Sequence, residues 1–300
     1  MNKCPICSSI EVVTEKENPS YSLCWCKKCD LVFTNPMKGP ESAFYEDALY
    51  YKIGRILDNR PLRWQHKTFI RGKIPHSGKL LDIGCDTGLF ISIAQKTGYE
   101  VTGIDVNSKA IETAISKYNL KNVFALSLEE FLVKTKDKFD VISLFEVLEH
   151  LENPRILFEQ IKKILNSGGY IVLSVPNRER TLDTFVDMDL PPNHLTQWNE
   201  KSINSLLSLF GFNIVKLDKK IKIDDIVLYL SSKTSIGLVK KKISESGAEP
   251  LPGNTVHVLK IFSKIKTAHV RFASFLLYPF LSLINMQSST IYVLAQQKKQ

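Results

Sequence analysis

Residues 80–88, which read Leu-Leu-Asp-Ile-Gly-Cys-Asp-Thr-Gly, constrain the fold of this chain more than any other stretch. An apolar run leads into a turn bounded by Gly84 and Gly88, a pattern that predicts a strand passing into a helix. Because glycine lacks a Cβ atom, such a turn can bring backbone close to a ligand. A second apolar run ends in Asp105, about 20 residues after the first glycine, where the ribose hydroxyls of a nucleotide would lie. The two segments predict a doubly wound α/β sheet that binds a nucleoside cofactor.

The kind of nucleoside follows from what this turn lacks. A dinucleotide-binding turn needs three glycines against a pyrophosphate. Here only two glycines are in register, and Asp82 and Asp86 add negative charge that repels phosphate. A cationic ligand without phosphates suits this turn better.

Residues 80–88 resemble motif I of the class I S-adenosylmethionine (SAM) dependent methyltransferases, and residues 101–105 resemble their second-strand motif. The resemblance implies a seven-stranded, Rossmann-like methyltransferase sheet with SAM as cofactor. Asp86 departs from the pattern, since it stands where the middle glycine is common, although Asp tolerates positive φ better than most residues. Cys85 is expected to pack rather than to act as a nucleophile. The expected SAM-binding set is Asp82, Gly84, Cys85, Asp86, Gly88, Asp105, Val106, Ser127, Leu128 and Phe145.

Five of the six cysteines lie in the first 29 residues, and four of these form two Cys-x2-Cys pairs separated by 18 residues. This spacing is typical of a structural zinc site with four thiolate ligands, here Cys4, Cys7, Cys26 and Cys29. A disulfide framework is the alternative. The lack of an apolar signal-peptide core at the N-terminus favours a reducing, cytoplasmic location instead. The run 26–36 also resembles the N-terminal zinc-binding region of one branch of these methyltransferases.

The segment with most side chains suited to catalysis is 145–151. It reads Phe-Glu-Val-Leu-Glu-His-Leu and lies at the end of an expected buried strand at 139–145. Ligands of open α/β sheets bind at the carboxyl ends of the strands. The segment resembles the Glu-x-x-Glu-His element that binds a divalent metal in ubiquinone-pathway O-methyltransferases and in small-RNA 2′-O-methyltransferases, the latter adding a later histidine. The resemblance implies a catalytic set of Glu146, Glu149, His150 and His194. Three roles stay open: a divalent metal on these residues, a metal-free general base at His150 or His194, and a purely structural one.

The rest of the chain predicts alternating helices and strands. The expected elements are a helix at 108–118 capped by Ser108, a strand at 122–126, a helix from Asn153 to Gly168-Gly169, a strand at 170–175, a helix at 200–210, and closing strands at 212–217 and 289–295. Aromatic and apolar residues between 44 and 70 predict helices that cap the cofactor edge of the sheet.

An apolar segment at 272–284 carries a central proline and is too short to span a bilayer, which needs about 20 residues. Peripheral membrane contact stays open, because Lys260, Lys264, Lys266 and Arg271 precede this segment and would meet anionic headgroups. The alternative is a helix packed on the core or on a partner subunit. The net charge of +9 favours acidic partners in general, yet the basic residues are scattered, which disfavours a nucleic-acid partner.

The expected organisation is a zinc-binding knuckle at 1–36, a helical cap at 37–76, the SAM-binding core at 77–218, an insertion at 219–287 and a final core strand and tail at 288–300. The expected activity is methyl transfer from SAM, to a hydroxyl of a small molecule, sugar or lipid-linked intermediate. The alternatives are an inactive SAM-binding scaffold and a nucleic-acid-binding or RNA 2′-O-methylating protein.

Overall fold

The computed structural model describes residues 3–40, 62–72, 74, 77–182, 189–232 and 270–298. Most of the expected helical cap, including the aromatic residues from Phe44 to Tyr51, lies outside these ranges, as does most of the expected insertion. The described part of the cap contains one helix, α3 (Trp64–Ile70).

A seven-stranded sheet forms the centre of the molecule, with the strand order β10-β11-β8-β7-β4-β5-β6. The first five strands of the core run parallel, whereas β11 runs antiparallel to both of its neighbours. This order confirms the expected doubly wound sheet with an antiparallel closing pair. The strands are β4 (Gly78–Ile83), β5 (Tyr99–Asp105), β6 (Val123–Ala125), β7 (Phe139–Phe145), β8 (Leu165–Pro176), β10 (Phe212–Lys220) and β11 (Gln287–Gln297).

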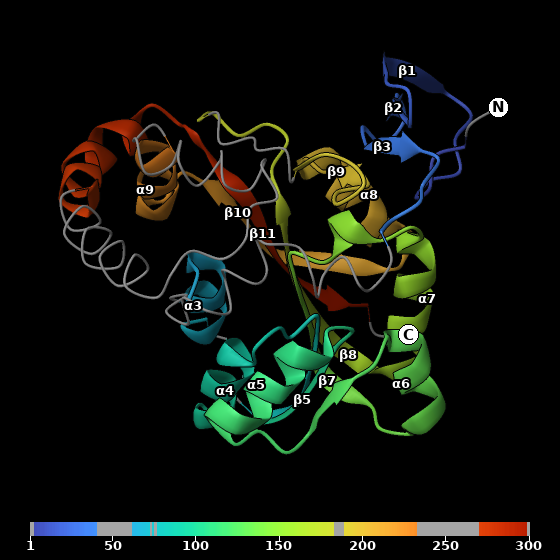
Figure 1. Cartoon of the computed structure of the whole chain (residues 1–300), viewed down its shortest axis with the longest axis vertical. Helices are drawn as coiled ribbons and strands as arrows, with labels where there is room; N and C mark the ends of the chain where they lie inside the picture. Colours follow the sequence, from blue (N-terminus) through green and yellow to red (C-terminus); the bar gives the residue numbers. More distant parts are fainter. Residues whose placement is uncertain are drawn as a thin grey trace, which may run out of the picture.

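Helices cover both faces of the sheet because its strands are apolar on both sides. One hydrophobic cluster joins alternate strand residues to α3, α4 and α5. The other joins the opposite strand residues to α6, α7 and α8. Figure 1 shows the two groups on opposite sides of the sheet. The helices are α4 (Leu89–Lys96), α5 (Ser108–Tyr118), α6 (Leu128–Lys134), α7 (Pro154–Ile164), α8 (Glu200–Leu209) and the short η1 (Leu148–His150).

The N-terminal residues form a separate antiparallel sheet that reaches the core. Its strands are β1 (Val12–Glu17), β2 (Ser22–Cys26), β3 (Val32–Asn35) and β9 (Thr196–Gln197). The last of these belongs to the loop between β8 and α8, so the N-terminal segment is hydrogen-bonded to a loop of the core (Figure 1). We call the segment from Cys4 to Asn35 the knuckle.

Two local expectations were wrong. The N-cap of α5 is Asn107, whose side chain accepts a hydrogen bond from the Ala110 amide, and Ser108 is the first helical residue. Helix α7 ends at Ile164, before the Gly168-Gly169 pair, which lies inside β8. Gly168 has a φ of 72°, and the register between β7 and β8 shifts beside it, so this glycine supports a bulge rather than a helix end.

The C-terminal part adds helix α9 (Ile223–Ser232) and a further helix at 270–283. The latter carries large apolar side chains that are more than half exposed, at helical spacing: Phe272, Phe275, Leu276, Phe280 and Leu283. No helix within the described ranges has the length and apolar character needed to cross a bilayer.

Candidate active site

The turn after β4 is built for close approach of a ligand to backbone. Gly84 and Gly88 have φ values of 76° and 78°, and Asp86 between them also has a positive φ of 47°. A Cβ atom on Gly84 would lie 2.6 Å from Cγ2 of Val147, in the loop after β7. The turn that is expected to bind SAM therefore touches the loop that carries the expected catalytic residues.

A buried carboxyl group, Asp82, and a partly buried one, Asp105, lie at this turn, and neither forms an ion pair with a cation of the described residues. Burial raises the pKa of Asp82 to about 7, and the charges of Asp105 and Asp86 add to the effect, although Ser143 Oγ donates a hydrogen bond of 2.6 Å. Burial also raises the pKa of Asp105, to about 6. The oxygens of Asp105 accept bonds from the amides of Asp86 and Asn107, at 2.9 and 2.8 Å. The two carboxyl groups at this turn therefore favour a cationic ligand.

The other residues expected at the cofactor lie at neighbouring strand ends. Ser127 caps α6 through a capping box with Glu130, which engages both its amide and its hydroxyl. Leu128 begins that helix and is buried, whereas Val106 is about half exposed. Burial raises the pKa of the Cys85 thiol well above its usual range, so this cysteine is a packed thiol and not a thiolate.

Two further residues lie at the site: Arg63, the N-cap of α3, and His66 within that helix. Nothing in the sequence indicated a functional role for either, apart from the aromatic residues around them. Nη1 of Arg63 is 3.7 Å from Oε2 of Glu146. The ring of His66 contacts Phe90 and Phe145, with ring centroids 5.2 and 4.6 Å away. Burial lowers the pKa of His66 to about 3, and its Nδ1 has no hydrogen-bond partner within the described chain.

The two glutamates after β7 have different surroundings. Glu146 has a φ of 58°, and its Oε1 accepts a 2.8 Å hydrogen bond from Ser174. Glu149 is 1% exposed, and neither carboxyl oxygen has a hydrogen-bond partner among the described residues. Burial, together with the charge of Glu146, raises the pKa of Glu149 well above its usual range. An orphaned buried carboxyl group of this kind fits a cation that is bound there.

Glu149, His150 and His194 come together, with one ligand atom from each within 4.8 Å of the others. Glu146 does not join this group, because its side chain turns to Ser174. The Asn193 carbonyl accepts a 2.7 Å hydrogen bond from Nδ1 of His150, which places the imidazole lone pair on Nε2. Burial, and the neighbouring His194, lower the pKa of His150 to about 4.

The loop that carries His194 is held against η1. The Leu195 amide donates to the Glu149 carbonyl at 2.7 Å, and the His150 and His194 rings meet edge to face with centroids 4.7 Å apart. Nδ1 of His194 lies 3.4 Å from Oδ1 of Asp189. The three cluster residues are therefore held by both loops, and the Asp189 carboxylate near Nδ1 can orient the His194 ring.

The expected zinc ligands also come together. The sulfur atoms of Cys4, Cys7, Cys26 and Cys29 lie within 4.8 Å of one another, and Cys24 does not belong to this group. The Cys29 thiol beside it lowers the pKa of Cys4 to about 5, which favours the thiolate form that binds metals. None of the six cysteines forms a disulfide.

Comparison with known proteins decides the family. A family model described as a methyltransferase domain matches residues 55–217, which is more than half of the chain. The chain belongs to the SAM-dependent methyltransferases. This methyltransferase is 29% identical, over 167 residues, to a ubiquinone biosynthesis O-methyltransferase from Coxiella burnetii; the match covers 48% of this chain and 71% of the relative.

Solved structures agree with this methyltransferase in fold. A SAM dependent methyltransferase from Archaeoglobus fulgidus superposes with a TM-score of 0.51 at 20% identity, covering 83% of this chain and all of that one. The cyclase SpnF superposes with a TM-score of 0.53 at 15% identity, covering 88% and 99% of the two chains. Because a protein called a cyclase shares the fold, the acceptor and its chemistry have to be argued from the site.

Proposed function

We propose that this methyltransferase transfers the SAM methyl group to a hydroxyl oxygen of a small molecule. The observation that supports the proposal is the cluster of Glu149, His150 and His194, on loops beside the turn at Gly84. A hydroxyl must lose its proton as it attacks, and imidazole is the usual proton acceptor near neutral pH. The name of the O-methyltransferase relatives supports oxygen as the acceptor atom.

The proposed reaction forms a bond between the acceptor oxygen and the methyl carbon while the bond from that carbon to sulfur breaks. The bonding electrons stay on sulfur, which becomes the neutral thioether of S-adenosylhomocysteine. The hydroxyl proton moves to an imidazole. His194 is suited to this because Asp189 faces its Nδ1 at 3.4 Å, and a carboxylate at that nitrogen leaves Nε2 to accept the proton.

A divalent metal on the same cluster is a second candidate, favoured by the two unpartnered oxygens of buried Glu149. Glu149, His150 and His194 would hold the ion, with one carboxylate and two imidazoles as its ligands. A bound divalent ion would lower the pKa of a coordinated hydroxyl. Metal analysis of the purified protein, and activity with and without EDTA, separate this role from that of a metal-free base. Glu149→Gln should lose the metal if one is bound.

We also propose that Cys4, Cys7, Cys26 and Cys29 hold a structural zinc ion, supported by their mutual distances and burial. One zinc per chain in the wild type is expected, with none in a Cys29→Ser variant. Far-UV circular dichroism should show β1 to β3 lost along with the metal, while the core sheet remains. A zinc-free protein with an intact knuckle would contradict this proposal.

Peripheral membrane contact, and with it a lipid-linked acceptor, is supported by the exposed apolar side chains of the helix at 270–283. Flotation with vesicles of phosphatidylglycerol and phosphatidylcholine tests it. Replacing Phe272, Phe275 and Phe280 by Ser should abolish flotation, while replacing the exposed Ile115, Val133 and Leu209 should not. Equal flotation of the two triple variants would contradict membrane contact through this helix.

The decisive experiment for the reaction combines binding and transfer. Calorimetry should show binding of SAM and of S-adenosylhomocysteine. Mass spectrometry after incubation with SAM and 3,4-dihydroxybenzoate, a probe with two adjacent hydroxyls, should detect an O-methyl product, and His194→Gln should lower its rate with little change in SAM affinity. Methylation of an amine probe such as glycine at a higher rate than any hydroxyl probe would overturn the proposed acceptor.

A further inference from the structure

The loop that carries His194 is attached to the knuckle on one side. Strand β9 begins two residues after His194, and it pairs with β3 through Val32 and Phe33. The Thr34 amide donates a further hydrogen bond of 2.9 Å to the Leu195 carbonyl. The position of His194 is therefore linked to the N-terminal segment as well as to the methyltransferase core.

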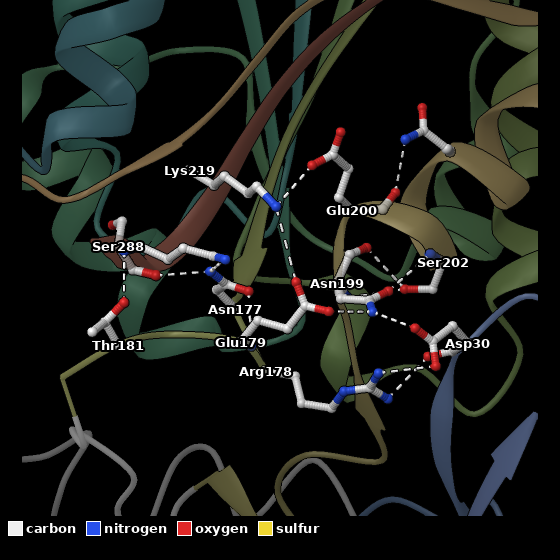
Figure 2. A network of polar contacts seen from close by, with 12 residues as sticks. Asp30, Asn177, Arg178, Glu179, Thr181, Asn199, Glu200, Ser202, Lys219 and Ser288 are labelled. Atoms are coloured by element: carbon white, nitrogen blue, oxygen red, sulfur yellow. Dashed lines mark hydrogen bonds and ion pairs between the residues drawn. The ribbon is translucent and has the colours of Figure 1, made fainter. Parts of the chain in front are cut away.

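A polar network reinforces this attachment, and it reaches the knuckle at Asp30, the residue after Cys29 (Figure 2). Arg178, just beyond β8, donates to the Asp30 carbonyl oxygen at 2.9 Å and forms an ion pair with its carboxylate at 3.2 Å. Trp25 Nε1 donates to the same carboxylate. The Asp30 and Arg178 side chains are each only 21% exposed, so water competes with this pair less than with a surface ion pair.

Asn199 joins the network to α8 at the other end of the loop (Figure 2). Its Nδ2 donates to Oδ2 of Asp30 at 2.7 Å and to Oε1 of Glu179 at 2.8 Å, while its Oδ1 caps the helix by accepting from the Ser202 amide. Asn199 is 1% exposed. The Arg178 amide donates to the Trp198 carbonyl at 2.8 Å. The end of the His194 loop is thus linked to Asp30 directly, by the side-chain amide of Asn199. It is also linked indirectly, through Arg178, whose backbone amide binds Trp198 and whose guanidinium group binds Asp30.

We propose that Asp30, Arg178 and Asn199 are positioning residues, which tie the His194 loop to the knuckle and so hold His194 against His150 and Glu149. The knuckle then helps to position His194 at the site, in addition to stabilising the N-terminal segment. Because Asp30 directly follows a proposed zinc ligand, metal in the knuckle would set the position of Asp30 and, through it, of the loop. The relevance to catalysis rests on the proposed role of His194.

Two substitutions test the network. Arg178→Met keeps most of the side-chain length and removes both contacts to Asp30. Asn199→Asp keeps an oxygen that can cap α8, but it places a carboxylate between Asp30 and Glu179. The matched control is Lys79→Met, which removes an ion pair to Asp137 of 2.7 Å on the far part of the core. Arg178→Lys should keep the slow hydrogen exchange of the loop only in part, because an ammonium group cannot contact the Asp30 carbonyl and carboxylate in the way the two guanidinium nitrogens do.

The readout is hydrogen exchange by mass spectrometry, which needs no acceptor. Both variants should exchange about tenfold faster than wild type in peptides from 189–198, including the Leu195 amide, since a lost hydrogen bond to a charged group has roughly this effect. Peptides from 77–145 should be unchanged, as should the zinc content and the SAM affinity. Chelation of zinc from the wild type should produce the same local increase.

Exchange in 189–198 that equals that of Lys79→Met in both variants would overturn the proposal, as would loss of protection spread evenly over the core. If Arg178→Met fails to fold, Asn199→Asp and zinc chelation still decide the matter. Failure of the proposed function would appear differently, as absent methyl transfer by the wild type. With an active acceptor, the variants should lower kcat per folded enzyme molecule, with the folded fraction measured by circular dichroism, and leave the KM for SAM unchanged. A general loss of stability would lower only the folded fraction.

Discussion

Replacing Asp82 by Asn tests the electrostatics of the cofactor turn most directly. Asp82 is 3% exposed, and burial raises its pKa from 3.8 to about 7. A carboxyl group whose pKa is higher in the folded state binds more protons when folded than when unfolded between these two values. Stability therefore falls as the pH rises from about 4 to 7, and it stays low above pH 7.

The size of this effect follows from the pKa difference. Each unit corresponds to about 1.4 kcal/mol. The contribution of Asp82 lowers the free energy of unfolding by about 2 kcal/mol at pH 5 and by about 4 kcal/mol at pH 8, compared with strongly acidic solution. The Asn variant has no such term. The difference in stability between variant and wild type should therefore move by about 2 to 3 kcal/mol in favour of the variant between pH 5 and pH 8.

Urea unfolding of the ligand-free proteins at pH 5, 6, 7 and 8 measures this change. Asn can still accept the hydrogen bond from Ser143, and any cost of its buried NH2 group is independent of pH, so only the slope of the difference matters. Asp137→Asn, at a carboxylate 59% exposed, serves as the control and should run parallel to wild type. If the Asp82→Asn curve also runs parallel to wild type, Asp82 is not a high-pKa group and the reasoning is refuted.

Three further predictions concern single residues of the site. Gly88→Ala should lower stability by about 1 to 3 kcal/mol in thermal unfolding, because φ is 78° and the new Cβ would lie 2.6 Å from Leu120 Cδ1. Asp86→Gly should raise stability by up to about 1 kcal/mol in urea unfolding, since it removes a side chain from a left-handed conformation. The His150 imidazole, with a pKa of about 4, should stay neutral down to pH 5 in an NMR titration; a midpoint near 6.5 would contradict its burial.

The sheet could be predicted from the sequence because its signals are local. Buried parallel strands appear as short apolar runs, and β7 begins and ends where the run 139–145 does. The turn at Gly84 and Gly88 marks the first strand and helix of the core. The glycines of β8 misled the same reasoning, since a glycine pair after a helix and a glycine bulge in a strand look alike until the partner strand is known.

The candidate site was predicted only in part, because some of its contacts join residues that are far apart in the sequence. Glu149 and His150 are adjacent in sequence, and His194 was placed with them by resemblance; the structure brings all three together. Glu146 turns away because Ser174, on the neighbouring strand, accommodates its carboxylate. A contact across strands leaves no trace in the local pattern. The same holds for Arg63 and His66, which reach the site only through the packing of α3.

Asp82 and Glu149 both indicate that the site binds ligands that carry positive charge. Both are buried carboxyl groups, 3% and 1% exposed, in or just after neighbouring strands of the core. A buried carboxylate without a cation destabilises the fold, and a cation that binds only the folded state offsets that cost. SAM carries positive charge, and Asp82 is ionised only above about pH 7. SAM should therefore bind more tightly, and stabilise the enzyme more, as the pH rises from 6 to 8. The opposite trend would mean that Asp82 does not face the cationic part of the cofactor.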